Sequence, residues 1–585
     1  MGLWGVGNFR NKNMNEEKKL SANEPLKINS DYLRGTLAEE IADTSTGAIT
    51  ADSQQLSKFH GMYLQDDRDV RKERRQKKLE KAFSFLIRVR LPGGVSTPEQ
   101  WLAMDRLADE YANGTLKITT RQTWQLHGVI KNNLKATIQG MDKALLDCIA
   151  ACGDVNRNVI CNANPHLSDV HAEAVELSRN ISEHLLPSSR AYHEIFLDEE
   201  KVLSSEEPVE PLYGETYLPR KFKINVAVPP ANDTDIYAQC LAFIAIVEDG
   251  KVLGYNVTVG GGMGMTHGKL ETFPRTADLI GFVTPDKAID VAEKVMLVQR
   301  DFGDRTDRRQ ARLKYTVERM SADGFRDKLE EYLGYKLEPA RDFKFEYNGD
   351  RFGWVEDDKG NHHYTLFVPG GRVRDTPSAA IKSGVAAIAQ MHKGEFRMTA
   401  NQNLVIANVS EDQKAAIEGL LEEYKILNGK DLSALRLNSI ACVALPTCGL
   451  SLAEAERYLP DLITELEEVI EEAGLRHDAI TIRMTGCPNG CGRPYLAEIG
   501  FVGKAPGKYN VYLGGGFQGQ RLNKLYRQSV LSGEIKDLLA PIIKDYAKSR
   551  NDGERFGDFV IRAGYVKETT AGNNFHDNVE EVKTS

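Results

Sequence analysis

Two short motifs in the second half of the chain carry four of its eight cysteines. Cys442 and Cys448 enclose five residues, and Cys487 and Cys491 enclose three, each pair in a turn rich in glycine or proline. Thiolates suit soft metals, and four of them suit an iron–sulfur cluster. A structural zinc site and four unrelated buried cysteines are the alternatives, but zinc pairs usually enclose about two to four residues. The spacing therefore favours a cluster.

The segment between the two motifs indicates how they could meet. Apolar residues recur at helical spacing from Leu459 to Ala473, with Pro460 in the expected first turn. A strand is predicted from Ala479 to Met484. Because a helix followed by a strand returns the chain to the same end of a sheet, we predict that the two motifs lie side by side.

Composition limits the class of protein. The 585 residues are enough for about three or four domains, and a net charge of −9 argues against a nucleic-acid partner. No apolar run approaches the roughly 18 residues of a membrane span, and the N-terminus fits neither a signal peptide nor a myristoylation site. We therefore predict a cytoplasmic protein without disulfides. The other four cysteines are predicted to be core thiols: Cys148, Cys152, Cys161 and Cys240.

The first half contains a predicted strand, turn, helix and second strand. The strand at 83–90 ends at Pro92-Gly93-Gly94. The residues from Trp101 to Tyr111 are predicted to be helical, and a strand region follows at 116–127.

The second half repeats this order. Pro369-Gly370-Gly371 ends a strand, and a helical stretch leads to a strand region at 396–404. The two Pro-Gly-Gly elements lie 277 residues apart, and Thr119 and Thr399 lie 280 apart. Chance similarity is the alternative, but the pattern predicts a duplicated α/β unit with pseudo-twofold symmetry. Further along, residues 156–161 match residues 438–442.

Seven cations are predicted on strands or beside turns rather than on surface helices. Each alone is explained by a surface position or a salt bridge, since an unpaired buried cation is costly. Together, beside a cluster, they indicate a pocket for a polyanion and a small anionic substrate, because Arg binds oxyanions in a fork and Lys supplies a charge and a proton. Electron transfer to an oxyanion is the reaction that joins the two features. The seven are Arg88, Arg90, Arg121, Arg157, Lys221, Lys223 and Arg312.

The remaining segments give weaker signals. Residues 1–80 are polar and predict an extended arm rather than a core, with Met14 as a possible alternative start. The basic run at 71–78 predicts a solvated face rather than a binding patch. Glycine loops at 260–264 and 514–516 could offer backbone N–H groups to an anion, although neither fits a dinucleotide or phosphate-loop fingerprint.

These motifs give the chain a family resemblance. It resembles the haemoprotein (beta) subunits of NADPH-dependent assimilatory sulfite reductases, within the sirohaem and 4Fe–4S nitrite and sulfite reductase superfamily. The resemblance runs from Tyr32 to Gly564. Besides the cysteine motifs, it is most specific at residues 59–69, 156–159 and 217–223, and the first of these favours the NADPH-linked type.

The resemblance implies the cofactors and the roles of individual residues. A 4Fe–4S cluster would be bound by Cys442, Cys448, Cys487 and Cys491, and Cys491 would also be the axial thiolate of one sirohaem. The sulfite-binding cations would be Arg88, Arg157, Lys221 and Lys223. The residues that hold or line the sirohaem would be Arg121, Gln125, His127, Arg220, Arg312, Asn489 and Arg493.

The resemblance also implies a fold and a reaction. The fold would be α/β (α+β), a duplicated pseudo-twofold sulfite/nitrite reductase fold in three domains with an extended N-terminal arm. The reaction would be the six-electron reduction of sulfite to sulfide, with electrons from NADPH through a separate flavoprotein subunit. The expected divisions are an arm at 1–80, a ferredoxin-like domain at 81–150 and 352–427, a first sirohaem/substrate domain at 151–331, a cluster domain at 332–351 and 428–570, and a polar tail at 571–585.

Two other functions remain open at this point. A sirohaem nitrite reductase would use the same cofactors on a different oxyanion, although the acidic-basic context of residues 66–69 and the paired Lys221 and Lys223 favour sulfite. A zinc-stabilised binding protein would belong to a different class. A visible spectrum distinguishes the classes, because a zinc protein without iron is colourless.

Overall fold

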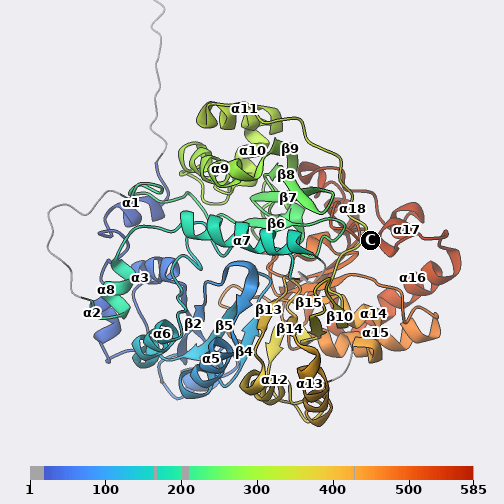
Figure 1. Ribbon diagram of the computed structural model, residues 1–585, viewed down its shortest axis with the longest axis horizontal. Helices are drawn as coiled ribbons and strands as arrows, with labels where there is room; N and C mark the ends of the chain where they lie inside the picture. Colours follow the sequence, from blue (N-terminus) through green and yellow to red (C-terminus); the bar gives the residue numbers. More distant parts are fainter. Residues whose placement is uncertain (1–18, 164–167, 200–209, 427–428, 584–585) are drawn as a thin grey trace, which may run out of the picture.

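A computed structural model describes residues 19–163, 168–199, 210–426 and 429–583 (Figure 1). The alternative start at Met14 lies outside these residues. Two five-stranded antiparallel sheets form the blue and yellow lower part of the molecule, in the orders β1-β2-β5-β4-β12 and β10-β11-β14-β13-β3. Their strands are β1 Met62–Asp66, β2 Phe83–Arg88, β3 Val95–Ser96, β4 Leu116–Ile118, β5 Trp124–Val129, β10 Gly353–Glu356, β11 His362–Leu366, β12 Arg372–Val373, β13 Glu395–Met398 and β14 Leu404–Val409.

The two sheets exchange their edge strands. β12 comes from the second half and pairs with β4 of the first, with Arg372 opposite Lys117. β3 comes from the first half and pairs with β13 of the second, with Arg397 opposite Val95. Each exchanged strand directly follows a Pro-Gly-Gly turn. This reciprocal arrangement confirms the predicted duplication, and it means that neither half completes its sheet alone.

Both predicted strand regions are hairpins rather than single strands. In the first copy, Thr119 N–H donates to Thr123 O at 3.0 Å, and in the second copy Thr399 N–H donates to Asn403 O at 2.9 Å. The same turn therefore separates the two strands of the hairpin in both copies. Helices cover each sheet in the same order (Figure 1), and α5 packs against α12. These helices are α5 Pro98–Tyr111, α6 Leu134–Lys143, α12 Ile381–Met391 and α13 Glu411–Glu423.

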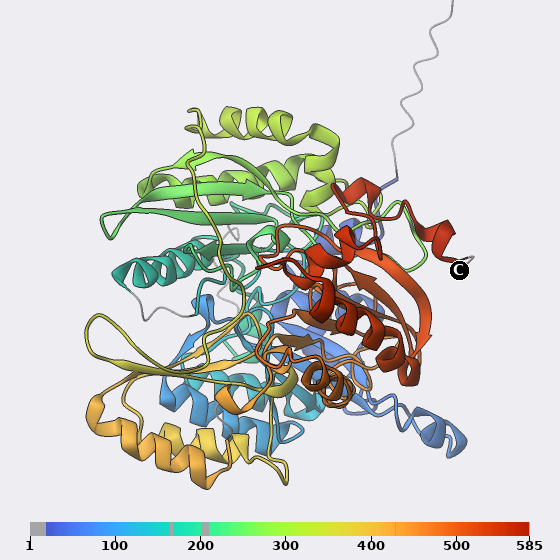
Figure 2. The same ribbon diagram turned by 90° about the vertical axis from the view of Figure 1, so that its right-hand side faces the viewer.

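A second pair of sheets carries the other repeated unit. Figure 2 shows the green sheet above and the orange-red sheet at the side of the molecule. The orders are β6-β7-β8-β9 and β15-β16-β17-β18-β19. The strands β6-β7-β8-β9 correspond to β16-β17-β18-β19. In both sets the first two strands are parallel, and each following strand pairs antiparallel with the one before it. The strands are β6 Ile224–Ala227, β7 Leu241–Glu248, β8 Lys251–Val259, β9 Asp278–Val283, β15 Ser439–Ala441, β16 Ile482–Thr485, β17 Ile499–Ala505, β18 Lys508–Leu513 and β19 Lys524–Leu531.

The first copy has an irregular counterpart of β15. Parallel bridges join Asn156 to Phe222 and Ile160 to Asn225, as Ile440 joins Arg483 in the second copy. The predicted equivalence of 156–161 and 438–442 is therefore confirmed, but Ile160 matches Ile440, so Asn162 rather than Cys161 corresponds to Cys442. The helices around these sheets are α7 Asp169–His184, α8 Ala191–Phe196, α9 Ala288–Phe302, α10 Leu313–Met320, α11 Ala322–Leu333, α14 Ala434–Leu437, α15 Leu459–Glu472, α16 Ile535–Ser549 and α17 Phe556–Arg562.

The N-terminal segment contributes to the core, so the expectation of an arm without a core is wrong for its described part. Leu37 and Met62 are fully buried, and β1 is an edge strand of the first sheet. Each short element supplies only one or two apolar side chains, and for this reason no periodicity is visible in the sequence. The basic run behaves as predicted, because α4 has no buried residue. The helices here are α1 Asn23–Ile28, α2 Leu37–Ala42, α3 Ala51–Leu56 and α4 Arg71–Gln76.

The C-terminal segment is also packed rather than a free polar tail. Phe575 is 1% exposed and stacks on Tyr512 with 5.7 Å between ring centroids. The segment ends in α18, Val579–Lys583. Hydrogen bonds hold it as well, since Asn578 Nδ2 donates to Leu525 O at 2.6 Å. A single buried aromatic residue is a weak signal in a polar sequence. No helix in the described ranges is long and apolar enough to cross a membrane.

Candidate functional site

The four candidate ligands lie in two loops at the same edge of one sheet. β15 and β16 are parallel, and Cys442 follows the first while Cys487 and Cys491 follow the second. α15 connects them as the sequence predicted. Cys442 N–H donates to Met484 O at 3.1 Å, and Gly486 N–H donates to Cys442 Sγ at 3.3 Å. The carboxyl ends of the two strands thus bring both motifs together.

Close backbone packing joins the two loops. Leu452 N–H donates to Gly486 O at 2.7 Å. A Cβ at Gly486 would lie 2.0 Å from Ser451 Oγ and 2.6 Å from Ala453 O. Glycine is therefore required here, because any side chain would separate the two cysteine loops.

The thiols influence one another electrostatically. Burial, and then the neighbouring Cys491, raises the pKa of Cys442 well above its usual value and that of Cys448 to about 12. Burial and Cys491 also raise the pKa of Cys487. In the described part of the chain, no three His, Cys, Asp or Glu side chains converge as they would around a single ion. Since ligand thiols must lose their protons, a positive centre that shares their charge is needed to hold these four as thiolates.

The other four cysteines are core thiols, as predicted. Cys148, Cys152, Cys161 and Cys240 are all fully buried. Burial raises the pKa of Cys161 to about 12, which keeps this thiol protonated.

The predicted cations gather beside the cysteine loops. Lys221 and Lys223 are half-buried and Phe222 between them is fully buried, so the alternation predicted from the sequence is confirmed. Burial, and then the positive charges of Arg312 and Arg157, lowers the pKa of Lys221 well below its usual value. The thiol of Cys491 acts in the opposite direction on Lys221. Lys221 therefore lies close enough to both the cations and Cys491 to interact with their charges.

Lys223 and Arg157 belong to the same cluster of cations as Lys221 and Arg88, and this cluster is called the cation pocket. Burial, and then Lys221 and Arg121, lowers the pKa of Lys223 well below its usual value. Arg157 donates to Gly153 O through Nε at 3.2 Å and Nη2 at 2.9 Å. Arg88 on β2 is paired with Gln125 on β5. With the amide group of Gln125 rotated by half a turn, its oxygen accepts from Arg88 Nε at 2.7 Å.

The pocket has an excess of positive charge. Within the described residues, no carboxylate lies within 4.0 Å of Arg88, Arg157, Lys221 or Lys223. Arg90 is different, because Nη2 donates to Asp147 Oδ2 at 2.7 Å and this pairing removes it from the pocket. A cluster of partly buried cations without counter-ions is unfavourable unless an anion binds to it.

Several residues expected to hold the sirohaem have buried polar atoms without a partner in the described structure. These atoms are Arg121 Nε, Arg312 Nε and His127 Nδ1. Arg121 Nη1 donates to Gln239 Oε1 at 2.9 Å, and burial lowers its pKa to about 9. Burial, and then Arg372, lowers the pKa of His127 well below its usual value and keeps the imidazole neutral. Unpaired donors of this kind fit a cofactor that carries many carboxylates.

The other residues expected at the cofactor have protein partners. Asn489 Nδ2 donates to Cys487 Sγ at 3.4 Å. Arg220 lies 4.0 Å from Asp154, and burial lowers its pKa to about 10. The guanidinium of Arg493 contacts Asp235 and donates to Ala400 O at 2.8 Å. The structure thus places Arg493 in a buried ion pair beside the site.

Both glycine loops are built into the scaffold, so their predicted role as an anion cradle is wrong for four of their amides. These N–H groups donate to backbone carbonyls at 2.8–3.1 Å and belong to Gly260, Gly262, Gly514 and Gly516. The first loop instead touches the cysteine loop, since Met265 N–H donates to Pro488 O at 2.9 Å.

Two residues of the site were not identified from the sequence. The Tyr63 phenol lies against Cys152 and Arg157, and burial raises its pKa. Burial, and then Arg308, lowers the pKa of Lys58 to about 8. Both lie within or next to the 59–69 segment that carries the family resemblance, so that segment was the available signal.

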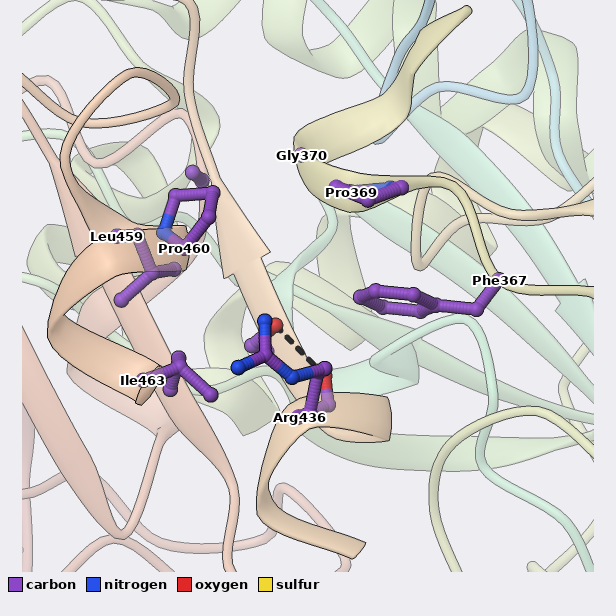
Figure 3. A pocket seen from close by; sticks show the side chains of 9 residues that line it. Phe367, Pro369, Gly370, Arg436, Leu459, Pro460 and Ile463 are labelled. Carbon is purple, nitrogen blue, oxygen red and sulfur yellow. Dashed lines mark hydrogen bonds between the residues drawn. The ribbon is translucent and has the colours of Figure 1, made fainter. Parts of the chain in front are cut away.

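A small cavity lies next to β15 but outside the site. Figure 3 shows Pro369 and Phe367 on one side and Leu459 and Pro460 on the other. Only Ala441, which precedes Cys442, connects it to the cysteine loops. This cavity is a gap in packing beside the Pro-Gly-Gly turn rather than a binding pocket.

A buried ion triad fastens the first cysteine loop to the exchanged strands. Lys117 Nζ lies 2.6 Å from Glu456 Oε2, and Arg372 Nη2 lies 2.7 Å from Glu456 Oε1. Glu456 N–H donates to Cys442 O at 3.1 Å. Burial alone would raise the pKa of Glu456, but Lys117 and Arg372 outweigh it and hold the pKa at about 2.

Replacing Glu456 with Gln should destabilise the fold by about 3 kcal/mol, because two buried cations lose their counter-ion. The depressed pKa means that this contribution is present above pH 4.5 and is lost as the pH falls toward 2. Urea unfolding of both proteins at pH 7 and pH 4 measures the difference, which should be smaller at pH 4. An equal difference at both pH values, or none, would contradict the role of the triad.

Two family models match the chain. One, described as the nitrite and sulphite reductase 4Fe-4S domain, matches residues 176–337. The other, described as the nitrite/sulfite reductase ferredoxin-like half domain, matches residues 77–144 and 355–424. The two half-domain matches confirm the duplication. The first range covers the first repeated copy, whereas the four candidate ligands lie in the second.

Curated relatives and a solved structure cover nearly the whole chain. The NADPH sulfite reductase hemoprotein beta-component of Anoxybacillus flavithermus is 59% identical over 555 residues, 95% of this chain and 97% of the relative. The protein of the same name from Bacillus subtilis is 58% identical with the same coverage. The structure of the Mycobacterium tuberculosis NirA protein matches with a TM-score of 0.77 at 25% identity, covering 93% of this chain and 97% of that one.

The fold and the site therefore define a redox enzyme of the nitrite and sulfite reductase class. Within that class, the chain belongs to the family of NADPH sulfite reductase hemoprotein beta-components, and it is an oxidoreductase. The expected pair of cofactors, a haem and a 4Fe–4S cluster, is confirmed at the level of the family. A zinc-stabilised binding protein is excluded as a class.

Proposed function

We propose that the chain reduces sulfite to hydrogen sulfide by six electrons in the cytoplasm, in sulfate assimilation and cysteine biosynthesis. The observation that carries this proposal is one place in the structure. There, four thiols at a single sheet edge lie beside cations that have no carboxylate within 4.0 Å among the residues that the structure describes. Thiols of this kind hold a redox metal centre, and such cations hold an oxyanion.

We assign the cluster to Cys442, Cys448, Cys487 and Cys491, and Cys491 would also be a ligand of the sirohaem iron. When bound, the two cofactors would supply one-electron transfer chemistry next to the substrate-binding cations. Gly486 N–H and Asn489 Nδ2 donate to the sulfurs of Cys442 and Cys487. Such hydrogen bonds would stabilise these two residues as thiolate ligands and would make a bound cluster easier to reduce. The unpaired atoms of Arg121 and His127 would hold sirohaem carboxylates.

The chain's own part in the reaction is to bind the substrate oxygens and to supply protons. Arg88 and Arg157 offer fixed N–H groups, while Lys221 and Lys223 each carry a mobile ammonium. The depressed pKa of both lysines makes the protonated form a ready acid. Each oxygen that leaves the sulfur needs protons to depart as water, and these two side chains are placed to deliver them.

The electrons would come from NADPH through a separate flavoprotein subunit. The sequence has no dinucleotide fingerprint in either glycine loop. Four amides of those loops, at Gly260, Gly262, Gly514 and Gly516, also donate to backbone carbonyls. The relatives are named as beta-components, which supports a second, electron-supplying component.

Steady-state assays with reduced methyl viologen test the choice of substrate. We expect kcat/KM for sulfite to exceed that for nitrite, with sulfide as the product. A kcat/KM far higher for nitrite would replace sulfite with nitrite as the substrate. A preparation with full iron and sirohaem that reduces neither anion would contradict the proposed function altogether.

A further inference from the structure

A fully buried carboxylate lies next to the second cysteine loop, outside the cation pocket. Asp235 is 0% exposed. Arg483 Nη1 donates to its Oδ2 at 2.7 Å, and Arg493 Nε binds the same oxygen. Arg483 Nη2 and Asn348 Nδ2 each donate to the other oxygen, Oδ1, at 3.2 Å. Two arginines on one buried carboxylate make a rigid anchor, because every acceptor position is used.

Asp235 and Arg493 occupy equivalent positions in the two repeated copies. They are 258 residues apart, which is also the separation of Ile224 and Ile482 at the starts of β6 and β16. Both have left-handed backbone angles, and each is followed by a short 3₁₀ turn. The pseudo-twofold axis thus passes between an Asp and an Arg that bind each other.

This pair is connected to Cys491 by short contacts. Arg493 is two residues beyond Cys491, and its Nη2 donates to Ala400 O at 2.8 Å. Its Nη1 donates to Thr120 O at 3.3 Å, and Thr120 Oγ1 donates to Cys491 O at 3.0 Å. Thr120 and Ala400 are the equivalent turn residues of the two half-domain hairpins. Arg493 therefore fixes the loop of Cys491 against both halves of the molecule.

The first copy holds its equivalent loop in another way. Asn162 Nδ2 donates to Asp233 Oδ1 at 2.6 Å, and Asn162 Oδ1 accepts from Val228 N–H at 2.5 Å. Asn162 corresponds to Cys442, 280 residues later, while Asp233 and Val228 correspond to Cys491 and Gly486, 258 residues later. In the second copy, Gly486 N–H donates to Cys442 Sγ. A direct side-chain hydrogen bond thus closes the first loop, whereas Cys491 is exposed and its backbone needs another anchor.

We propose that Asp235 is a positioning residue that holds Arg493, and through it the backbone of Cys491, in the geometry that joins the cluster to the sirohaem. The inference rests on the proposed function for the identity of the cofactors. The carboxylate itself is too deeply buried, and too fully bonded, to act on substrate. Its effect is on where the bridging thiolate lies.

The test uses the full-length holoenzyme of three variants. Asp235→Asn removes the charge that holds both arginines. Thr120→Val removes only the hydroxyl that binds Cys491 O, at a half-exposed residue, so that it should fold even where Asp235→Asn does not. Glu194→Gln is the matched control, because it breaks a largely buried ion pair with Arg34 far from the cysteine loops.

We measure the ratio of sirohaem and of iron to protein after gel filtration, and the thermal midpoint of each variant. Asp235→Asn should lower sirohaem occupancy by about tenfold or more, the range seen when partners of metal ligands are lost. Thr120→Val should lower it severalfold, and Glu194→Gln should retain full occupancy. These readouts do not involve substrate, so failure of the proposed function would leave them unchanged.

Two results would overturn the proposal. Full sirohaem occupancy in Asp235→Asn would show that the carboxylate does not position the ligand. If Asp235→Asn and Glu194→Gln have the same thermal midpoint and lose sirohaem to the same extent, the role of Asp235 is a general structural one. Where Asp235→Asn does not fold, full occupancy in Thr120→Val has the same meaning.

Discussion

Replacing Cys491 with Ser should reduce sulfite turnover to below about one-hundredth of wild type, since even outer partners of metal ligands contribute about 10–100-fold. Serine has nearly the same shape, but its oxygen is a hard ligand with little affinity for a soft iron–sulfur centre. The other three thiols would remain together, because their loops are joined by backbone hydrogen bonds such as Leu452 N–H to Gly486 O at 2.7 Å. Methyl viologen assays, iron content and the visible spectrum measure the loss.

Cys148→Ser is the matched control for this change. Cys148 is fully buried, and its Sγ donates to Tyr192 Oη at 3.5 Å, a bond that a serine hydroxyl can also make. This variant should keep its iron and its activity. Wild-type-like turnover in Cys491→Ser would rule out the bridging role, and a comparable loss in both variants would indicate damage to folding instead.

The cysteine site was the part most readable from sequence, because its geometry is local. A parallel β–α–β connection brings the ends of two strands together whatever lies around them. Because a core-facing helix is predicted from Leu459 to Ala473, Cys442 and Cys487 are expected to lie close together, as the structure shows. The alternation at Lys221 and Lys223 was readable for the same reason, since it depends only on extended backbone.

The exchange of edge strands could not be predicted, because it depends on pairing between distant segments. Arg372 and Lys117 are opposite each other although 255 residues separate them, and each strand of this pair is only two or three residues long. Such short strands have no periodic pattern. The offset between the Pro-Gly-Gly elements revealed the duplication but not that each copy completes the other.

The role of Arg493 shows a second limit of sequence reasoning. The family resemblance makes it a candidate cofactor residue. The structure instead gives its guanidinium Asp235 as a partner, 258 residues earlier in the chain. A cation near a binding motif has the same appearance in sequence whether it faces a ligand or a buried carboxylate. Only the three-dimensional pairing separates the two roles.

The second large effect is expected from replacing a lysine of the cation pocket, which should lower sulfite turnover. Lys221 and Lys223 are held among other positive charges, and neither ammonium has a carboxylate within 4.0 Å in the described structure. Their positive charges are therefore free to bind an incoming anion, because they form no ion pair with a described carboxylate. Removing one of them should affect the bound oxyanion more than the protein or the larger cofactor, which many residues hold.

Lys221→Ala should lower kcat/KM for sulfite by about 10²–10³-fold, the effect of losing one group that stabilises developing charge. Sirohaem content should fall by much less. Lys221→Arg keeps the charge but is a poor acid, so it should restore binding of sulfite more than kcat. Lys78→Ala, at an exposed lysine beyond α4, is the control and should behave as wild type. Equal losses of sirohaem and turnover in Lys221→Ala would mean that this side chain mainly supports the cofactor, because substrate binding alone leaves the cofactor in place.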